Sequence, residues 1–420
     1  MFELEQNKTN VKTEFIAALT TFFTLSYIFV INPRFLADAG MDYGAVFVAT
    51  AISGGIATLL MGVLLNRPFA LVAGMGLNSY FSYSIVRTMG FRWEAALAAV
   101  FASNILILII VLLRINFSKA IPESFKHALI AGLGLFLVFI GMQNAHFVVM
   151  NPNTFVSIGD LTQPAALIAV FGFFVTSALV VKNVKGGMFL GVVATTLVAM
   201  LAGFAPLPAG IFEMPPDVSS VAFRMDLQAL SDPALFPVVW SLFIIVLLDL
   251  VGSITALSVK AGKSMEGLDK AIGVNAVGGA IGAGLGTSPM ITYLESASGI
   301  EAGGRTGLTA VFIALFFFIS IFFFPVISAI PIEAAAPVMI IVGEMMLLQI
   351  RFIDLKDHTE AIPALMTVAT IPFTFSISNG IGVGSIAYIF LKLVSKKPQE
   401  IHPAMYLIAL LSILAFANVL

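Results

Sequence analysis

Long apolar runs recur along the whole chain, separated by short polar stretches. A helix needs about 20 apolar residues to cross roughly 30 Å of hydrocarbon. By that measure the first half holds seven predicted spans, at residues 14–33, 43–65, 68–86, 93–113, 122–144, 164–182 and 186–204. The second half holds seven more, at residues 235–258, 266–285, 288–302, 306–327, 335–350, 360–377 and 379–395. The pattern predicts an all-α polytopic membrane protein of about 14 transmembrane helices.

A longer polar stretch, residues 205–234, separates the two sets and is rich in Pro and acidic residues. The chain is therefore predicted to consist of a first repeat (1–204), an extracytoplasmic linker (205–234), a second repeat (235–395) and a C-terminal segment (396–420). The apolar part of that last segment, 402–418, is short for a span. It is expected either to lie in the membrane interface or to form an extra span.

The basic residues give the orientation, because cytoplasmic loops of membrane proteins carry an excess of Lys and Arg. On the predicted spans, only Arg34, Arg87, Arg92 and Arg224 of the 21 Lys and Arg residues fall on the side away from the N-terminus. The N-terminus is therefore predicted to be cytoplasmic, and the protein to be a multi-pass protein of the cell (inner or plasma) membrane.

An odd number of spans in each set means that the second set starts on the opposite side of the membrane from the first. The two sets are therefore predicted to be inverted repeats. Such repeats are typical of secondary transporters, which bind their substrate near the midplane between the repeats. Channels and membrane enzymes can also contain repeats, so this feature alone leaves the function open.

The third span of each set is interrupted by helix-breaking residues: Gly74 and Gly76 in the first, and Gly286, Pro289 and Gly299 in the second. Non-helical backbone at membrane depth is tolerated where it is buried in protein or lines a cavity. Interrupted segments at matching positions of two repeats point to a transporter's binding site. Simple kinking or close packing of a helix is the alternative for each break taken alone.

Acidic residues inside spans are costly and usually face the protein interior or a polar pathway. Asp249 lies in the middle of the eighth span, and Glu295 lies at the break of the tenth. A buried carboxylate can bind the N–H groups of a planar polar ligand and can also take up a proton, so both acids are candidates for substrate binding and proton coupling. Either acid could instead be structural. Glu301 is expected to form an ion pair with Arg305, four residues later.

Other side chains near the breaks offer hydrogen bonds or stacking surfaces. Asn78 carries an amide with both donors and an acceptor, and Thr292 a hydroxyl close to Glu295. The candidates for stacking on an aromatic ligand are Phe22, Phe23, Tyr27, Phe69 and Phe81. With 38 Phe in the chain, most such rings simply face lipid or pack between helices.

Composition excludes several classes of protein. The chain is 59% hydrophobic and 10% charged, which is too apolar for a water-soluble domain. A formal net charge of -2 argues against a nucleic-acid partner. There is no cysteine, and the four histidines show no metal-ligand spacing, so no metal or other cofactor is expected. An enzyme would need a nucleophile–base pair, and a channel more polar residues per span; neither is expected.

Four segments resemble the azaguanine-type purine (hypoxanthine, guanine or adenine) permeases, a branch of the nucleobase–cation symporter superfamily. They are TTFFTLSYIFVINP (20–33), VAGMGLNSYFSY (72–83), TYLESASGIEAGGRTGLTAV (292–311) and IPFTFSISNGIGVGSIAYIFLKL (371–393). The resemblance covers essentially the whole chain, and the segment around Glu295 is the most specific of the four.

The resemblance implies a fourteen-helix fold of two inverted seven-helix repeats, with short strands at the breaks in helices 3 and 10. It also implies a core domain (helices 1–4 and 8–11) that holds the substrate and a gate domain (helices 5–7 and 12–14) that moves against it. The implied function is secondary active import of a purine nucleobase by alternating access with proton symport. A homodimer is also suggested.

The resemblance assigns Glu295, Asn78 and Asp249 to the family's site. The breaks themselves add Gly74, Gly76 and Thr292 to the predicted substrate-binding residues. The chain departs from the family's D-x-F-D-T pattern at the eighth helix, where it has Val246 and Leu250 in place of an Asp and a Thr. A uracil, xanthine or other heterocycle permease therefore remains an alternative. An anion carrier or a channel on the same fold is more remote, because buried acids would repel an anion.

Overall fold

The computed structural model describes residues 2–114, 121–263 and 267–416. Within these ranges, nine helical stretches are long and apolar enough to cross a membrane. The other five predicted spans are also present. Two are the interrupted third and tenth, and three are the helices α8 (Gly187–Leu201), α10 (Leu268–Leu285) and α15 (His358–Thr374). Residue 266 of the ninth predicted span and residues 417–418 of the C-terminal segment lie outside the described residues.

The first repeat begins with a span that is broken in two at Ser26 and Tyr27. Asn10 caps its first helix by accepting a hydrogen bond from the Thr13 amide. The elements are α1 (Val11–Leu25), α2 (Ile28–Asp38), α3 (Tyr43–Leu65), β1 (Leu71–Ala73), α4 (Met75–Ser79), the π-helix η1 (Tyr80–Thr88), α5 (Trp93–Leu112), α6 (Glu123–Asn144), the hairpin β2 (Val148–Asn151) and β3 (Phe155–Ile158), α7 (Pro164–Val181) and α8 (Gly187–Leu201).

The second repeat follows a linker that contains only short 3₁₀ turns (η3–η5). Its elements are α9 (Phe236–Lys260), α10 (Leu268–Leu285), β4 (Met290–Thr292), α11 (Ser296–Glu301), α12 (Gly307–Ser320), η6 (Ile321–Phe323), α13 (Phe324–Ser328), α14 (Ile332–Leu347), η7 (Leu348–Phe352), α15 (His358–Thr374) and α16 (Ile377–Val394). A last apolar helix, α17 (Pro403–Phe416), packs on α16. The predicted boundaries agree with these elements to within a few residues.

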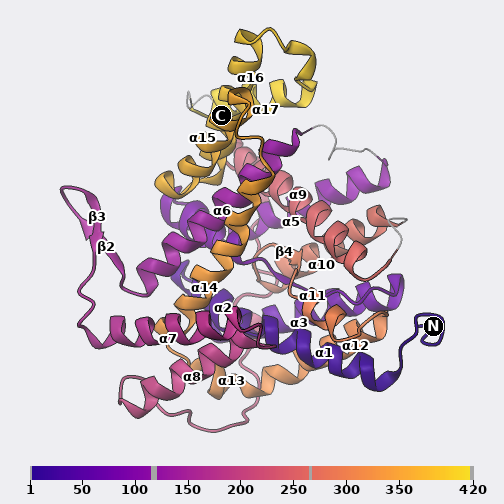
Figure 1. The fold of residues 1–420 in the computed structure, drawn as a ribbon, viewed down its shortest axis with the longest axis vertical. Coiled ribbons are helices and arrows are strands. Elements are labelled where there is room, and N and C mark those ends of the chain that lie inside the picture. The colour runs from indigo at the N-terminus through magenta and orange to yellow at the C-terminus, as the bar shows by residue number, and fades with distance from the viewer. Residues whose placement is uncertain (1, 115–120, 264–266, 417–420) are drawn as a thin grey trace.

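The main contacts between spans recur between their counterparts. The counterpart of a span is the one that lies seven spans later or earlier in the series of 14. Helix α3 packs on α12, as α10 packs on α5; α7 packs on α8, as α15 packs on α16; and α6 packs on α15, as α14 packs on α7. The pair α3 and α10 and the pair α6 and α14 map onto themselves. Figure 1 shows the two halves of the chain intertwined in one bundle. This pattern is what two inverted repeats produce.

The predicted strands are present at the two breaks. Strand β1 pairs antiparallel with β4, in a register that places Leu71 opposite Thr292 and Ala73 opposite Met290. Because every backbone polar group at membrane depth must be satisfied within the protein, the two interrupted spans satisfy each other. The pair also joins the first repeat to the second at the centre of the bundle.

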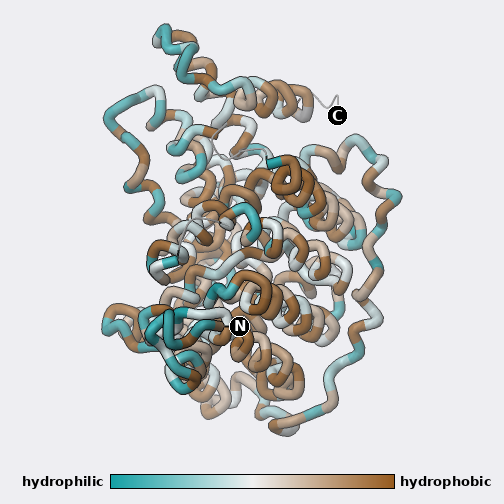
Figure 2. The backbone as a smooth tube through the Cα atoms, turned by 90° about the vertical axis from the view of Figure 1, so that its right-hand side faces the viewer, coloured by the Kyte–Doolittle hydropathy of each residue, from teal (hydrophilic) through white to brown (hydrophobic). Residues whose placement is uncertain are grey.

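Apolar residues cover most of the helices, as the brown stretches of tube in Figure 2 show, while hydrophilic residues gather around the N-terminus. Small residues allow close helix contacts in membranes. At the crossing of α3 and α12, an added Cβ at Gly307 would lie only 1.9 Å from the carbonyl oxygen of Gly62. This crossing therefore tolerates no side chain at Gly307.

Replacement of Gly307 by Ala is expected to lower the thermal stability of the purified protein. Overpacking of a tight contact usually costs about 1–3 kcal/mol. Gly252 on α9 is the matched control, because an added Cβ there meets nothing within 4 Å. The melting temperatures of Gly307→Ala and Gly252→Ala, measured in the same detergent, give the comparison. Equal melting temperatures would contradict the close contact of α3 with α12.

Candidate functional site

The two breaks form a single hydrogen-bonded unit. The amide of Gly74 donates to the carbonyl of Pro289 (2.9 Å), and the amide of Tyr293 donates to the carbonyl of Ala70 (2.9 Å), which extends the strand pair at both ends. The Tyr293 hydroxyl donates to the carbonyl of Ala73 at 2.8 Å. Each strand is followed at once by a half-helix, α4 or α11, so the starts of both half-helices are held at the strand pair.

Glu295 lies at the start of α11 and is partly exposed. Its carboxylate accepts a hydrogen bond from the hydroxyl of Tyr27, which lies at the break of the first span. Asp249, in the middle of α9, lies within electrostatic reach of Glu295. No described residue donates a hydrogen bond to the buried Oδ2 of Asp249. The structure thus brings together the two acids that the sequence singles out.

Asn78 belongs to a second polar cluster, organised by Asn32 of α2. Asn32 donates to the hydroxyls of Thr50 (2.7 Å) and Thr287 (2.9 Å), and it accepts from Ser288 (2.8 Å) and from the Asn78 amide (3.2 Å). All five side chains are buried. The cluster therefore links α2, α3, the third span and the approach to β4.

The carbonyl oxygen of the Asn78 side chain has no hydrogen-bond partner among the described residues. A buried acceptor without a partner costs free energy, and native structures leave few such groups unsatisfied. Asn78 thus keeps an acceptor available, while its donor is held by Asn32.

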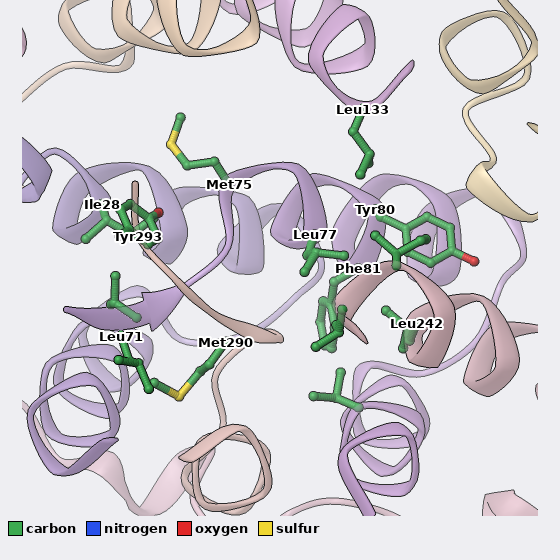
Figure 3. Packing of buried hydrophobic residues seen from close by; sticks show 14 of the residues in the cluster. Ile28, Leu71, Met75, Leu77, Tyr80, Phe81, Leu133, Leu242, Met290 and Tyr293 are labelled. Carbon is green, nitrogen blue, oxygen red and sulfur yellow. The ribbon is translucent and has the colours of Figure 1, made fainter. Parts of the chain in front are cut away.

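The other predicted site residues have mainly structural contacts. The Gly74 amide belongs to the strand pair, and an added Cβ at Gly76 would lie 3.4 Å from the Leu133 side chain of α6. In Figure 3, Leu133 points from α6 toward the half-helix that carries Leu77. Thr292 Oγ1 lies 3.2 Å from the Asn275 amide, so its hydroxyl is directed at α10 rather than at Glu295.

The expected ion pair between Glu301 and Arg305 is wrong. Glu301 instead pairs with Lys260 at the end of α9. The Arg305 guanidinium donates to the carbonyls of Ile300 (2.5 Å) and Gly304 (2.9 Å). The reason is that α11 ends at Glu301, and Gly303 follows with φ +107°, so the helical spacing that the ion pair requires does not continue.

The two positions that depart from the family pattern are completely buried. Val246 and Leu250 on α9 are both 0% exposed and belong to the main hydrophobic core. They flank Asp249 on α9 without being exposed themselves. The departure therefore replaces polar side chains by apolar packing around Asp249 and leaves that acid in place.

For two candidate site residues, the sequence pattern gave a different role (Tyr27) or no indication (Asn32). Tyr27 is suggested there as a stacking ring, whereas its hydroxyl contacts Glu295. Asn32 is not singled out, although it is a fully buried amide within a span. The available signal was the amide of Asn32 inside an apolar run, because a buried amide needs hydrogen-bond partners.

Comparisons with known proteins give a consistent result. The chain matches the Permease family over residues 12–383. It is 42% identical to a putative permease of Methanocaldococcus jannaschii (99% of this chain, 97% of the relative). It is 36% identical to the adenine permease AdeP of Escherichia coli (99% and 94%) and 36% identical to the guanine/hypoxanthine permease PbuO of Bacillus subtilis (98% and 98%).

The fold is also found among solved structures. The transmembrane domain of a cyanobacterium bicarbonate transporter, BicA, superposes with a TM-score of 0.67 at 15% identity, covering 88% of this chain and 97% of that chain. The likeness supports the predicted inverted-repeat fold. Together with the match along most of the sequence, it leads to one conclusion: this chain belongs to the permease family.

Proposed function

We propose that the chain imports a purine nucleobase, namely hypoxanthine, guanine or adenine, across the cell membrane in symport with protons. The observation that carries this proposal is the pair of acids, Glu295 and Asp249, beside the two paired breaks. The proposal is supported by 36% identity to an adenine permease and to a guanine/hypoxanthine permease along almost the whole chain. The N-terminus would lie in the cytoplasm, as the basic residues predict.

The chemistry of the site suits a purine. A purine presents an edge of alternating donors and acceptors, and the site offers a carboxylate at Glu295 and an unpartnered acceptor at Asn78. Glu295 would accept hydrogen bonds from ring N–H groups, because hydrogen bonds to a charged acceptor are stronger than neutral ones. Tyr27 would hold the carboxylate in place from the other side.

Asp249 is the better candidate for the proton. Its Oδ2 has no partner among the described residues, and the nearby carboxylate of Glu295 makes a second negative charge unfavourable. Proton uptake by Asp249 would remove that repulsion and let Glu295 stay charged for the substrate. Substrate binding and protonation would then favour each other, which is the thermodynamic requirement for symport.

Alternating access would require the gate domain (α6–α8 and α14–α16) to move against the core domain (α1–α5 and α9–α13). Several contacts across this boundary would have to change. Ser378 of α16 bonds to the hydroxyls of Tyr80 and Ser241 at 2.8 Å each, and Ser84 donates to the carbonyl of Phe375. These few polar contacts are where the two domains would separate.

The test is uptake of radiolabelled hypoxanthine, guanine, adenine, xanthine and uracil into cells that lack their own base permeases, at an acidic and at a neutral external pH. We expect hypoxanthine, guanine or adenine to enter, and to enter faster at acidic pH. Entry of uracil or xanthine alone would assign the substrate to the alternative class. If no base enters despite expression at the cell surface, the proposed substrate class is wrong.

The homodimer that the resemblance suggests stays a prediction. The mass of the purified protein in a mild detergent, after subtraction of the bound detergent, decides between a monomer and a dimer.

A further inference from the structure

A groove of about 450 Å³ runs between α5 and α10, two helices that pack side by side. Its lining is entirely apolar apart from glycine backbone. Helix α10 contributes residues at the helical spacing i, i+3, i+4, i+7 and i+8, which lie along one face. The lining residues are Phe101 and Leu108 of α5, Val277, Ala280, Ile281, Gly284 and Leu285 of α10, and Phe223 and Met225 of the linker.

The linker closes one end of this groove. The amide of Phe223 donates to the carbonyl of Gly284 on α10 (2.7 Å), and the amide of Asp226 donates to the carbonyl of Glu94 on α5 (3.0 Å). The segment 223–226 is therefore bonded to both walls. The rest of the groove runs along two spans, and Val277 is 38% exposed on its surface. A groove at that depth on the outside of the bundle faces hydrocarbon rather than water.

A positive charge lies at the closed end. Arg224 stands between the two linker residues that line the groove, and its side chain is exposed. Its Nε donates to the carbonyl of Ser219 at 3.3 Å, and the two terminal nitrogens are free of hydrogen bonds to the residues that the structure describes. Of the neighbouring acids, Glu94 pairs with Arg92 through Oε1, while its buried Oε2 has no partner among the described residues, and Asp226 accepts from the Gln228 amide at 3.0 Å.

We propose that this groove binds one glycerophospholipid, with an acyl chain along α5 and α10 and its phosphate at Arg224. An acyl chain alone gains little by leaving other lipid tails, because lipid and apolar side chains are equally apolar. The phosphate contact therefore supplies the preference, since a guanidinium fork matches phosphate oxygens. An anionic headgroup such as that of phosphatidylglycerol adds a charge that phosphatidylcholine lacks.

The bound lipid would attach the linker to the core domain. The linker connects α8 of the proposed gate domain to α9 of the core domain, so its position responds to movement between them. A lipid that contacts both Arg224 and the two walls would hold segment 223–226 in place while the gate moves. The proposal does not depend on the transported substrate.

The test is competition between phosphatidylglycerol and phosphatidylcholine for the purified full-length protein, measured by native mass spectrometry. A basic residue near lipid phosphate contributes about 1 kcal/mol, so the wild type is expected to retain phosphatidylglycerol roughly fivefold better. In Arg224→Gln this preference should disappear. In Arg92→Gln, the control at the same end of the bundle, it should persist.

Two further variants test the groove itself. An added Cβ at Gly284 meets only Met225 at 3.9 Å and Phe223 at 4.0 Å, both of which line the groove, so the Leu side chain of Gly284→Leu would extend into the groove. Gly284→Leu and Val277→Trp are both expected to lose retention of either lipid, whereas Leu197→Trp on the exposed face of α8 should keep it. Wild-type retention in both filled variants would overturn the proposal, as would an unchanged headgroup preference in Arg224→Gln. Loss of a dimer in Val277→Trp would instead assign the groove to a second copy of the chain and would also overturn it.

Discussion

Replacement of Glu295 by Gln is expected to weaken purine uptake more than any other single substitution, with an apparent affinity roughly 10- to 100-fold lower. The estimate follows from the loss of a hydrogen bond to a charged acceptor, about 1.5–3 kcal/mol. The amide that replaces the carboxylate also presents a donor to the ring N–H groups of the substrate. Initial rates of uptake at several purine concentrations measure the change.

Two variants show whether the effect is specific to the site. Glu301→Gln changes the other acid of α11, whose partner is Lys260 at the end of α9, and it should transport like the wild type. Tyr27→Phe keeps the carboxylate but removes the hydroxyl that contacts it, and it should raise the apparent KM with a smaller effect on the maximal rate. Wild-type affinity in Glu295→Gln, at equal surface expression, would remove Glu295 from the substrate site.

Replacement of Asp249 by Asn is expected to uncouple transport from protons. An amide has nearly the size of the carboxyl group but cannot exchange a proton. In proteoliposomes, the variant should therefore fail to accumulate purine against its gradient when a pH difference is imposed. It should still exchange internal for external purine, because exchange moves no net protons. Asp269→Asn, at the exposed start of α10, is the control that should behave like the wild type.

The two experiments separate binding from coupling. A variant that loses both accumulation and exchange has lost the substrate site, whereas one that loses accumulation alone has lost the proton. If Asp249→Asn accumulates purine as the wild type does, the coupling proton is not carried by Asp249.

The sequence predicts the architecture well because the membrane imposes a strong local rule. Every span must be apolar over its own length, and the breaks at Gly74 and Pro289 are visible for the same reason. The β1–β4 pairing came only from the family resemblance, since short strands leave little trace in so apolar a sequence. Local sequence patterns are therefore sufficient to predict the membrane spans and their breaks.

Contacts between distant segments could not be predicted in the same way. Tyr27 and Glu295 are 268 positions apart, and no periodicity relates them. The Asn32 cluster draws residues from four separate segments of the chain. Even the local prediction at Glu301 failed, because α11 ends at Glu301 itself and Arg305 therefore does not lie one helical turn further along. Side-chain partners depend on the packed bundle, and the sequence shows only which residues need a partner.

The strand pair at the centre of the bundle has a consequence for how the protein is made. Tyr293 and Ala73, which are hydrogen-bonded, lie 220 positions apart. At about 5–20 residues per second, a ribosome needs tens of seconds to reach the second partner. During that time β1 has no strand to pair with. In hydrocarbon its backbone N–H and C=O groups would stay unsatisfied, at a cost of several kcal/mol each. The third span is therefore expected to enter the lipid late, or to wait beside the insertion machinery until its partner has been synthesised.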